Sequence, residues 1–189
     1  SFSGIADEAF IGCQSLVDVK IPEGVTSIGT GAFFNCENLT SVTFPSSLTS
    51  IGASAFKQCW KLTSVDIPDG VTSISGYAFQ DCHELTSVKI PSSVKSIGEY
   101  AFEGCKKLTS IKIPDGVVSI GDYAFSSCFL LNDIEIAKSV TTIGDNAFIQ
   151  TLGPVRIDKP TNSIAKAPWG TTGAIIWNDN LIIGDKYVC

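Results

Sequence analysis

Residues 101–123 read AFEGCKKLTSIKIPDGVVSIGDY, and the same pattern recurs along the chain with a 23-residue period. Two columns of the repeat show this period most clearly. The cysteines of one column are Cys13, Cys36, Cys59, Cys82, Cys105 and Cys128, and the phenylalanines of another are Phe10, Phe33, Phe56, Phe79, Phe102, Phe125 and Phe148. A fixed period of this length indicates an array of repeated coils, so the fold is predicted from the single unit.

Each unit is predicted to contain a strand, a turn, a second strand and a short helix. Apolar and polar residues alternate in Leu108–Ile113, which is typical of a strand with one face in water. Pro114 has no N–H to donate to a neighbouring strand, so the strand should end there, before the turn at Asp115-Gly116. Val117–Ile120 is long enough for a second strand, and Asp122–Cys128 is expected to form one or two helical turns.

One unit cannot bury its apolar side chains by itself. About eight positions in each unit are apolar, and a single coil offers nothing to cover them. If the strands of successive coils pair in parallel, about 4.8 Å apart, equivalent side chains form continuous columns of Phe, Leu, Ile and Cys. The sequence therefore predicts an α/β solenoid, a superhelix of 23-residue units with short parallel strands and short helices.

The two ends of the chain depart from the repeat. Residues 2–5 match the second strand of the unit, so the array begins mid-repeat, and we expect an upstream cap or further repeats to shield the first apolar layer. After Phe148 the pattern shortens by two residues and loses its cysteine, although Leu152 begins one more Leu-x-x-Val-x-Ile match. We predict a repeat array over residues 1–157 and a C-terminal capping segment over residues 158–189; the alternative for the latter is the start of another domain.

The unit L-x-x-I-x-I-P-x-x-V-x-x-I-G-x-x-A-F-x-x-C resembles the leucine-rich repeats of the BspA-like (Treponema pallidum type) family. The resemblance covers residues 2 to about 150, and residues 159–170 resemble the unit that ends such arrays in some bacterial members. It implies a curved, right-handed solenoid within a larger secreted or surface-anchored protein, with a role in adhesion to host proteins or other cells. It implies no enzyme. Ala137 in place of the proline and Ala6 in place of the first glycine are modest departures.

Composition excludes several classes of protein. Hydrophobic residues make up 44% of the chain and charged residues 17%, which is incompatible with a disordered protein. No apolar run is long enough for a membrane span. Thirteen Lys and Arg against nineteen Asp and Glu leave a net charge of -6, the wrong sign for binding nucleic acid.

The cysteine column invites a metal or a disulfide interpretation, and neither fits. Zinc sites need pairs of thiolates two to four residues apart, and the sequence contains no C-x-x-C. Thiols on adjacent coils would all point the same way, which disfavours the disulfide dihedral angle. We expect a buried column of thiols that act as small apolar groups and weak donors to backbone. Cys189, outside the column, could pair with a partner that the sequence does not reveal.

The sequence contains no set of residues that would support catalysis or cofactor binding. His83 is the only histidine, so a nucleophile activated by an imidazole would have to use it. It follows Cys82 at a variable repeat position, where a solvated surface histidine is the simpler interpretation. No Walker sequence, G-x-G-x-x-G or calcium loop is present, and we expect no cofactor.

Two surfaces are candidates for binding, because their residues differ from coil to coil while stacking fixes the others. The outward strand positions form a small, polar face with a lysine patch at Lys89 and Lys112. A protein or glycan could bind this face, but a merely solvated sheet would look the same.

The second surface is the column that follows the cysteines. Trp60, His83, Lys106 and Phe129 occupy successive coils there, and exposed aromatic rings beside cations are typical of binding hot spots. The alternative is that Trp60 and Phe129 pack against neighbouring turns.

These features predict a noncatalytic, extracellular recognition module of a secreted or cell-surface protein, monomeric by itself, whose partners are host or microbial surface proteins or glycans. The alternative function is a structural spacer that holds another domain away from the cell. Asn38 begins an N-x-T sequon, which has meaning only if the source is a secreting protist.

Overall fold

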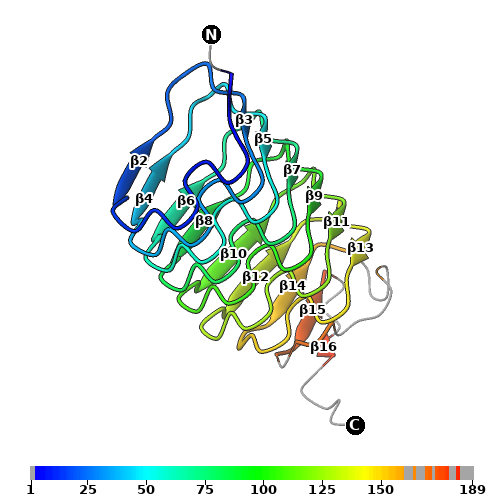
Figure 1. The fold of residues 1–189 in the computed structure, drawn as a ribbon. Coiled ribbons are helices and arrows are strands. Elements are labelled where there is room, and N and C mark those ends of the chain that lie inside the picture. Colours follow the sequence, from blue (N-terminus) through cyan, green and yellow to red (C-terminus); the bar gives the residue numbers. More distant parts are fainter. Residues whose placement is uncertain (1–2, 160–163, 165–168, 172, 179–181, 184–189) are drawn as a thin grey trace.

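The computed structural model describes residues 3–159, 164, 169–171, 173–178, 182 and 183. Its strands lie in two rows that run along a solenoid (Figure 1). Row A is one seven-stranded sheet of β1 (Gly4–Ile5), β3 (Ser27–Ile28), β5 (Ser50–Ile51), β7 (Ser73–Ile74), β9 (Ser96–Ile97), β11 (Ser119–Ile120) and β13 (Thr142–Ile143). Row B consists of β2 (Asp18–Lys20), β4 (Ser41–Thr43), β6 (Ser64–Asp66), β8 (Ser87–Lys89), β10 (Ser110–Ile113), β12 (Asp133–Ile136), β14 (Val155–Ile157), β15 (Ile175–Trp177) and β16 (Ile182–Ile183).

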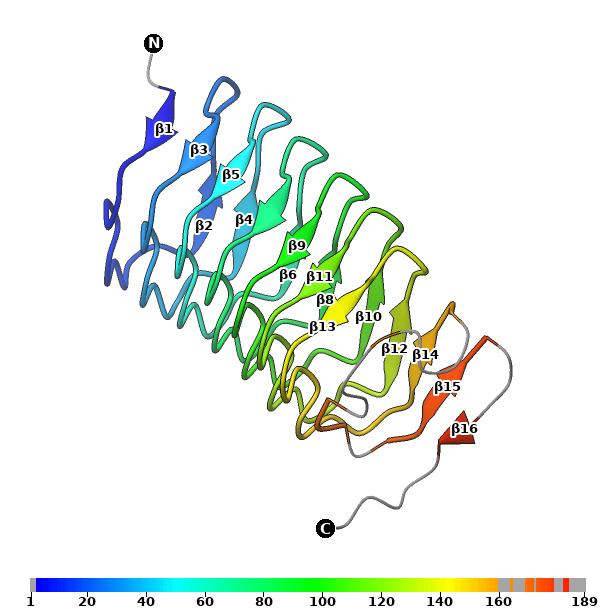
Figure 2. The same ribbon diagram turned by 90° about the vertical axis from the view of Figure 1, so that its right-hand side faces the viewer.

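The register of the strands confirms the period. Ile28 pairs with Ile51 in row A, and Val65 pairs with Val88 in row B, so each partner lies one 23-residue step further along the chain. The pairing is parallel in both rows up to β15, and β16 then pairs antiparallel with β15 (Figure 2). Equivalent side chains of neighbouring coils therefore lie over one another, as predicted.

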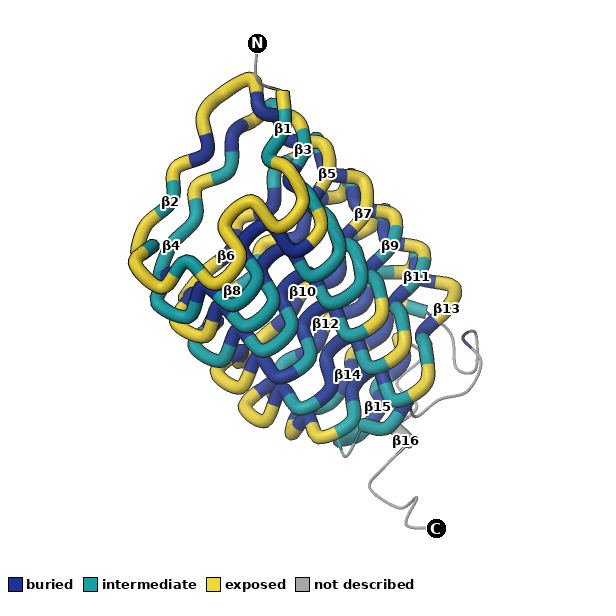
Figure 3. Tube along the Cα trace, in the orientation of Figure 1, coloured by how far each residue is buried: buried dark blue, intermediate teal, exposed yellow. Residues whose placement is uncertain are grey.

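The core is built from these columns (Figure 3). Phenylalanine rings on successive coils are stacked, with centroids 5.1–5.5 Å apart and planes within 10° of parallel. Each thiol from Cys36 to Cys128 donates a hydrogen bond to the carbonyl of the phenylalanine 26 residues earlier, at 3.1–3.4 Å. The prediction of a thiol column that donates to backbone is confirmed.

The prediction of short helices is wrong, because the third side of each coil is a series of turns. In Asp122–Cys128, the N–H of Ala124 and that of Ser126 bond to carbonyls three residues earlier, whereas the N–H of Phe125 bonds to Ala147 on the next coil at 2.8 Å. Alternate N–H groups thus point along the solenoid, away from the carbonyls that an α-helix would use. Non-glycine residues with positive φ break the helical path further, among them Tyr123 at 55°. The fold is a parallel β-solenoid rather than an α/β one.

The first coil leaves its apolar side open. Phe10 is 39% exposed, whereas Phe33 behind it is 1% exposed. A hollow of about 480 Å³ lies beside these rings, lined also by Ile5, Leu16 and Val19. The first apolar layer is therefore partly exposed among the described residues, and the expected upstream cap or further repeats stay a prediction.

The last regular coil is two residues shorter than the others. Thr151 takes the place of the cysteine; it is fully buried, and its hydroxyl donates to the carbonyl of Phe148 at 2.8 Å. Gly153 then lies so close to the backbone of Asn132 that a Cβ atom would come within 2.1 Å. Leu152 begins the last Leu-x-x-Val-x-Ile match, but it is 65% exposed and does not continue the buried leucine column.

Beyond β14 the sheet continues into β15. Trp169 and Trp177 are 2% and 1% exposed, with ring centroids 6.3 Å apart. The division at residue 157 into array and cap stays a prediction, and Cys189 lies outside the described residues. Nothing in the described part of the chain forms a helix that could cross a membrane.

Candidate functional site

A corner joins the turn side of each coil to row B, and the residue after the cysteine lies on it. Backbone bonds connect these corners: Glu84 N–H donates to the carbonyl of Trp60 at 3.0 Å, and Lys107 N–H to that of His83 at 3.2 Å. The side chains after each cysteine therefore follow one another from coil to coil, as the sequence predicted.

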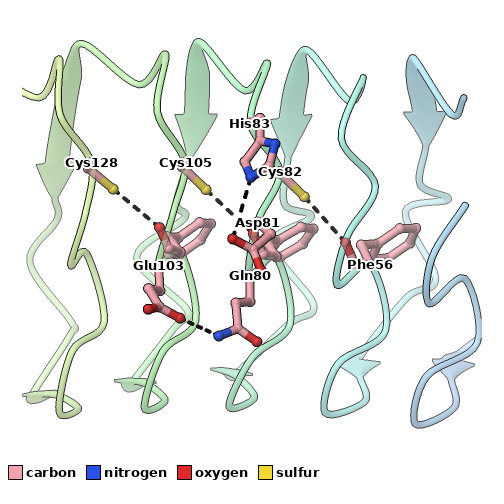
Figure 4. Close-up of polar contacts among 10 residues, drawn as sticks. Phe56, Gln80, Asp81, Cys82, His83, Glu103, Cys105 and Cys128 are labelled. Atoms are coloured by element: carbon pink, nitrogen blue, oxygen red, sulfur yellow. Dashed lines mark hydrogen bonds and ion pairs between the residues drawn. The ribbon is translucent and has the colours of Figure 1, made fainter. Parts of the chain in front are cut away.

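Trp60 and His83 are in contact on this corner. Their ring centroids are 5.9 Å apart and their planes are inclined by 10°. The Nε2 atom of His83 lies 3.5 Å from an oxygen of Asp81, as Figure 4 shows. Sequence reasoning missed Asp81, because different residue types hold its repeat position in successive coils, from Asn35 to Ser127.

The other two members of the column remain in solvent. Phe129 is 45% exposed and Trp60 is 39% exposed, so neither ring is fully covered by the neighbouring turns. Lys106 lies between their coils and is also exposed. Sequence reasoning missed the exposed Leu130 and Leu152 near Phe129, because a leucine in a repeat is expected to be buried.

The row B face carries charge in pairs. Lys89 lies 3.4 Å from Asp66, and Lys112 lies 3.7 Å from Glu135, with both lysines more than 70% exposed. Arg156 forms an ion pair with Asp133 on the same face. The predicted lysine patch exists as two neighbouring cations, but each has a carboxylate on the coil away from the other.

Two shallow grooves follow this face. One, of about 570 Å³, is lined by Glu23, Thr43, Asp66, Asp69 and Lys89 among others. The second, of about 560 Å³, has a charged lining of Lys112, Asp115, Glu135, Arg156 and Asp158. Both mix positive and negative groups, so neither selects strongly for a charged ligand.

The thiols are unsuited to nucleophilic chemistry. Burial raises the pKa of Cys59 and of Cys82 well above the ordinary thiol value, which disfavours the thiolate that a nucleophile or metal ligand needs. The cysteines from Cys13 to Cys128 are free thiols. No cluster of three potential metal-ligating side chains occurs among the residues that the structure describes.

A tyrosine column lies at another edge of the turn side and was missed. Tyr77, Tyr100 and Tyr123 stack with centroids 5.0 and 4.9 Å apart, and the same 23-residue step could have revealed them. Lys57 lies over Tyr77 at 5.4 Å, and the amide of Asn146 donates to the Tyr123 hydroxyl at 3.0 Å. Desolvation, followed by the charge of a neighbouring carboxylate, raises the pKa of Tyr77. Since both ends of the column are engaged, it serves packing better than ligand stacking.

Polar side chains on the same turn side also pair between coils. The amide of Gln80 donates to the carboxylate of Glu103 (Figure 4). This bond ties two neighbouring coils together on the turn side.

Comparison with known proteins matches the repeat to a family model. The model described as "BspA type Leucine rich repeat region" matches in six copies, over residues 3–93 and 72–167. No curated protein matches the chain.

Two solved structures show the same coil. A leucine-rich repeat protein of T. pallidum is 33% identical, with a TM-score of 0.73 over 78% of this chain and 69% of that one. A leucine-rich repeat protein from Bacteroides ovatus ATCC 8483 is 32% identical, with a TM-score of 0.66 over 86% of this chain. The match spans 48% of the Bacteroides protein, so this chain corresponds to about half of that protein's length.

Proposed function

This chain belongs to the BspA-type leucine-rich repeat family, and from that premise we propose that it is a noncatalytic recognition module. It binds proteins or glycans of host or microbial surfaces through the faces that its repeats build. Its setting is a secreted or cell-surface protein, and its role is adhesion. The family and its repeat architecture support an interaction module, and the resemblance of the repeats supports the surface setting.

The exposed aromatic rings of the corner carry this proposal. Stacking accounts for every buried column, yet Trp60 and Phe129 expose 39% and 45% of their surface where the solenoid does not need them. Large aromatic side chains of this kind supply much of the binding energy in protein interfaces. A partner that covered them would gain the apolar burial that the fold leaves unused.

The geometry around the single histidine supports a noncatalytic role. The imidazole of His83 is engaged by the face of Trp60 and by Asp81. The thiol of neighbouring Cys82 points inward and donates to the carbonyl of Phe56 at 3.3 Å. These two side chains therefore do not form a nucleophile and its base.

A binding screen tests the proposal. The purified protein is immobilised and exposed to panels of extracellular matrix proteins, bacterial surface extracts and glycans. At least one partner should bind, and Trp60→Ala or Lys89→Glu/Lys112→Glu should weaken it while leaving thermal unfolding unchanged. Silence across all panels would refute recognition.

The second candidate function is a structural spacer. The observation that favours it is the unbroken stacking of phenylalanine rings from Phe10 to Phe148, which suits a stiff rod. A spacer would bind none of the panels and would be insensitive to the variants above.

A further inference from the structure

The corner after the cysteines forms a continuous ridge that combines apolar and positive side chains. We call it the corner ridge, and it consists of Trp60, Lys61, His83, Glu84, Lys106, Lys107, Phe129, Leu130 and Leu152. The residues come from four successive coils and from the start of the fifth. Three steps of about 4.8 Å separate the coil of Trp60 from that of Phe129, so these two lie about 14 Å apart along the solenoid.

The apolar end of the ridge results from the shortened coil. Thr151 lies one full 23-residue step after Cys128. Leu152, which occupies the coil position of Leu131, follows Leu131 by two residues fewer than that step. The N–H of Leu152 bonds to the Leu131 carbonyl at 3.0 Å. The two missing residues are the counterparts of Phe129 and Leu130, so the described part of the next coil has no equivalent side chains to stack on these two. Phe129, Leu130 and Leu152 are accordingly 45%, 47% and 65% exposed.

The ridge carries excess positive charge on an acidic protein. Its charged residues are three lysines and one glutamate, whereas the whole chain has a net charge of -6. Lys107 is 2.5 Å from Glu84, and Lys61 donates to the side-chain oxygen of Asn38 at 2.8 Å. Lys106 has no ion pair with any residue that the structure describes.

Two further carboxylates flank the ridge without neutralising this end. Asp81 faces His83 at 3.5 Å, and Glu37 occupies the same column one coil before Trp60. The charge of Lys106, which has no ion pair among the described residues, therefore lies one coil before Phe129 and Leu130. Row B differs, because both of its neighbouring lysines are paired with carboxylates.

We propose that the corner ridge binds an extended segment of a partner protein that combines acidic and large apolar side chains. This inference rests on the proposed recognition function and names the partner chemistry. A carboxylate of such a segment would pair with Lys106, which has no ion pair among the described residues, and its apolar side chains would cover Phe129, Leu130 and Leu152. A span of about 14 Å corresponds to four or five extended residues. A purely anionic ligand would use the lysines and leave the apolar end exposed.

Synthetic peptides test this partner chemistry directly. The probe is a short fluorescein-labelled peptide of glutamate, leucine and phenylalanine, and its binding to the whole chain is measured by fluorescence anisotropy. Two matched probes replace either every glutamate by lysine or every apolar residue by serine. We expect the acidic apolar peptide to bind at least about tenfold more tightly than either matched probe, with affinity falling as salt is added.

Protein variants locate the binding. Lys106→Glu should lower the affinity for the acidic apolar peptide about tenfold, and Phe129→Ser/Leu130→Ser should lower it by a similar factor. Lys106 lacks an ion pair and Phe129 is half exposed, so these variants should fold, which thermal unfolding monitors. Lys95→Glu, at an exposed lysine beside β9 and away from both candidate surfaces, is the charge-matched control and should leave peptide affinity unchanged.

Three outcomes would overturn the inference. The first is equal affinity for the serine-substituted peptide, which would indicate binding of any anion. The second is unchanged affinity in the ridge variants, and the third is loss of peptide binding only in the Lys95→Glu control. If proteins or glycans bind in the screen and only the row B variant weakens them, the ridge inference fails and the recognition function stands. If the screen and the peptides are both silent, both proposals fail.

Discussion

Replacing Phe79 by alanine measures how much the phenylalanine column contributes to stability. Phe79 is fully buried, and its ring stacks 5.5 Å from Phe56 and 5.4 Å from Phe102. Burial of a phenylalanine contributes about 3 kcal/mol, and each stacked pair adds about 0.5–1.5 kcal/mol. Because phenylalanine truncations in cores cost about 3–5 kcal/mol, we expect Phe79→Ala to lower the free energy of unfolding by about 4–5 kcal/mol.

Phe10 provides a matched comparison within the same column. It is 39% exposed and stacks on Phe33 alone, at 5.1 Å. The burial contribution therefore falls to about 2 kcal/mol, with about 1 kcal/mol from the single stack, and water rather than a cavity would replace the ring. Phe10→Ala should cost about 2–3 kcal/mol. Lys89→Ala, which breaks an exposed ion pair with Asp66, should cost about 0–1 kcal/mol.

Urea denaturation followed by circular dichroism compares the three variants with the parent chain. If the slope of free energy against urea is unchanged, the shift in midpoint gives the loss of stability directly. A smaller slope would show that part of the array unfolds separately, as repeat proteins can. Equal losses from Phe79→Ala and Phe10→Ala, or a loss below about 2 kcal/mol for Phe79→Ala, would refute the view of the column as a continuous core.

Other measurements examine the turns and the thiols. Ser54 has a φ of 56°, so Ser54→Gly should raise the unfolding temperature, with a gain of about 0.5–1 kcal/mol, and no gain would show that the neighbouring coils already offset the strain. Gly104→Ala should lower the unfolding temperature, because a Cβ atom there would come within 2.5 Å of a carboxylate oxygen on the preceding coil and φ is 70°. Burial raises the pKa of Cys82 above the ordinary thiol value of 9.0, so above that pH the unfolded thiol loses a proton that the folded thiol keeps. The free energy of unfolding should therefore fall as the pH rises past 9.0, and it should fall less steeply in the Cys82→Ala variant. Iodoacetamide should modify the partly exposed Cys13 of the native protein before Cys82, and equal rates would contradict the buried thiol column.

The columns of the core were predictable from sequence, because stacking forces one residue type to recur at one position. Ile51 and Ile74 are paired as the 23-residue step requires, and both are buried. The prediction of a helix after Gly121 was wrong, and the residue types of this segment do not reveal the reason. Tyr123 and Ser127 adopt positive φ although neither is glycine, since hydrogen bonds to the next coil hold the backbone there.

The candidate site was predictable in position and less so in chemistry. The column of Trp60 and His83 followed directly from the spacing, but the pairing of His83 with Asp81 depends on a turn geometry that no pattern encodes. The pairing of Lys89 with Asp66, in contrast, could have been predicted, because the 23-residue step makes them neighbours on paired strands. Leu152 shows the limit of the repeat as a guide, since a two-residue deletion moved a consensus leucine to the surface.

The inter-coil hydrogen bonds of the turn side have a consequence for the evolution of this chain. Because Phe102 N–H bonds to Ala124 and Phe125 N–H to Ala147, every coil uses its neighbour in the same way. Duplicating or deleting one complete 23-residue unit would return each of these turn groups to an equivalent partner, whereas an insertion within the turn side of one coil would displace the turn groups of that coil from their partners. Such a gene can change the length of its product in whole coils without inventing a new contact.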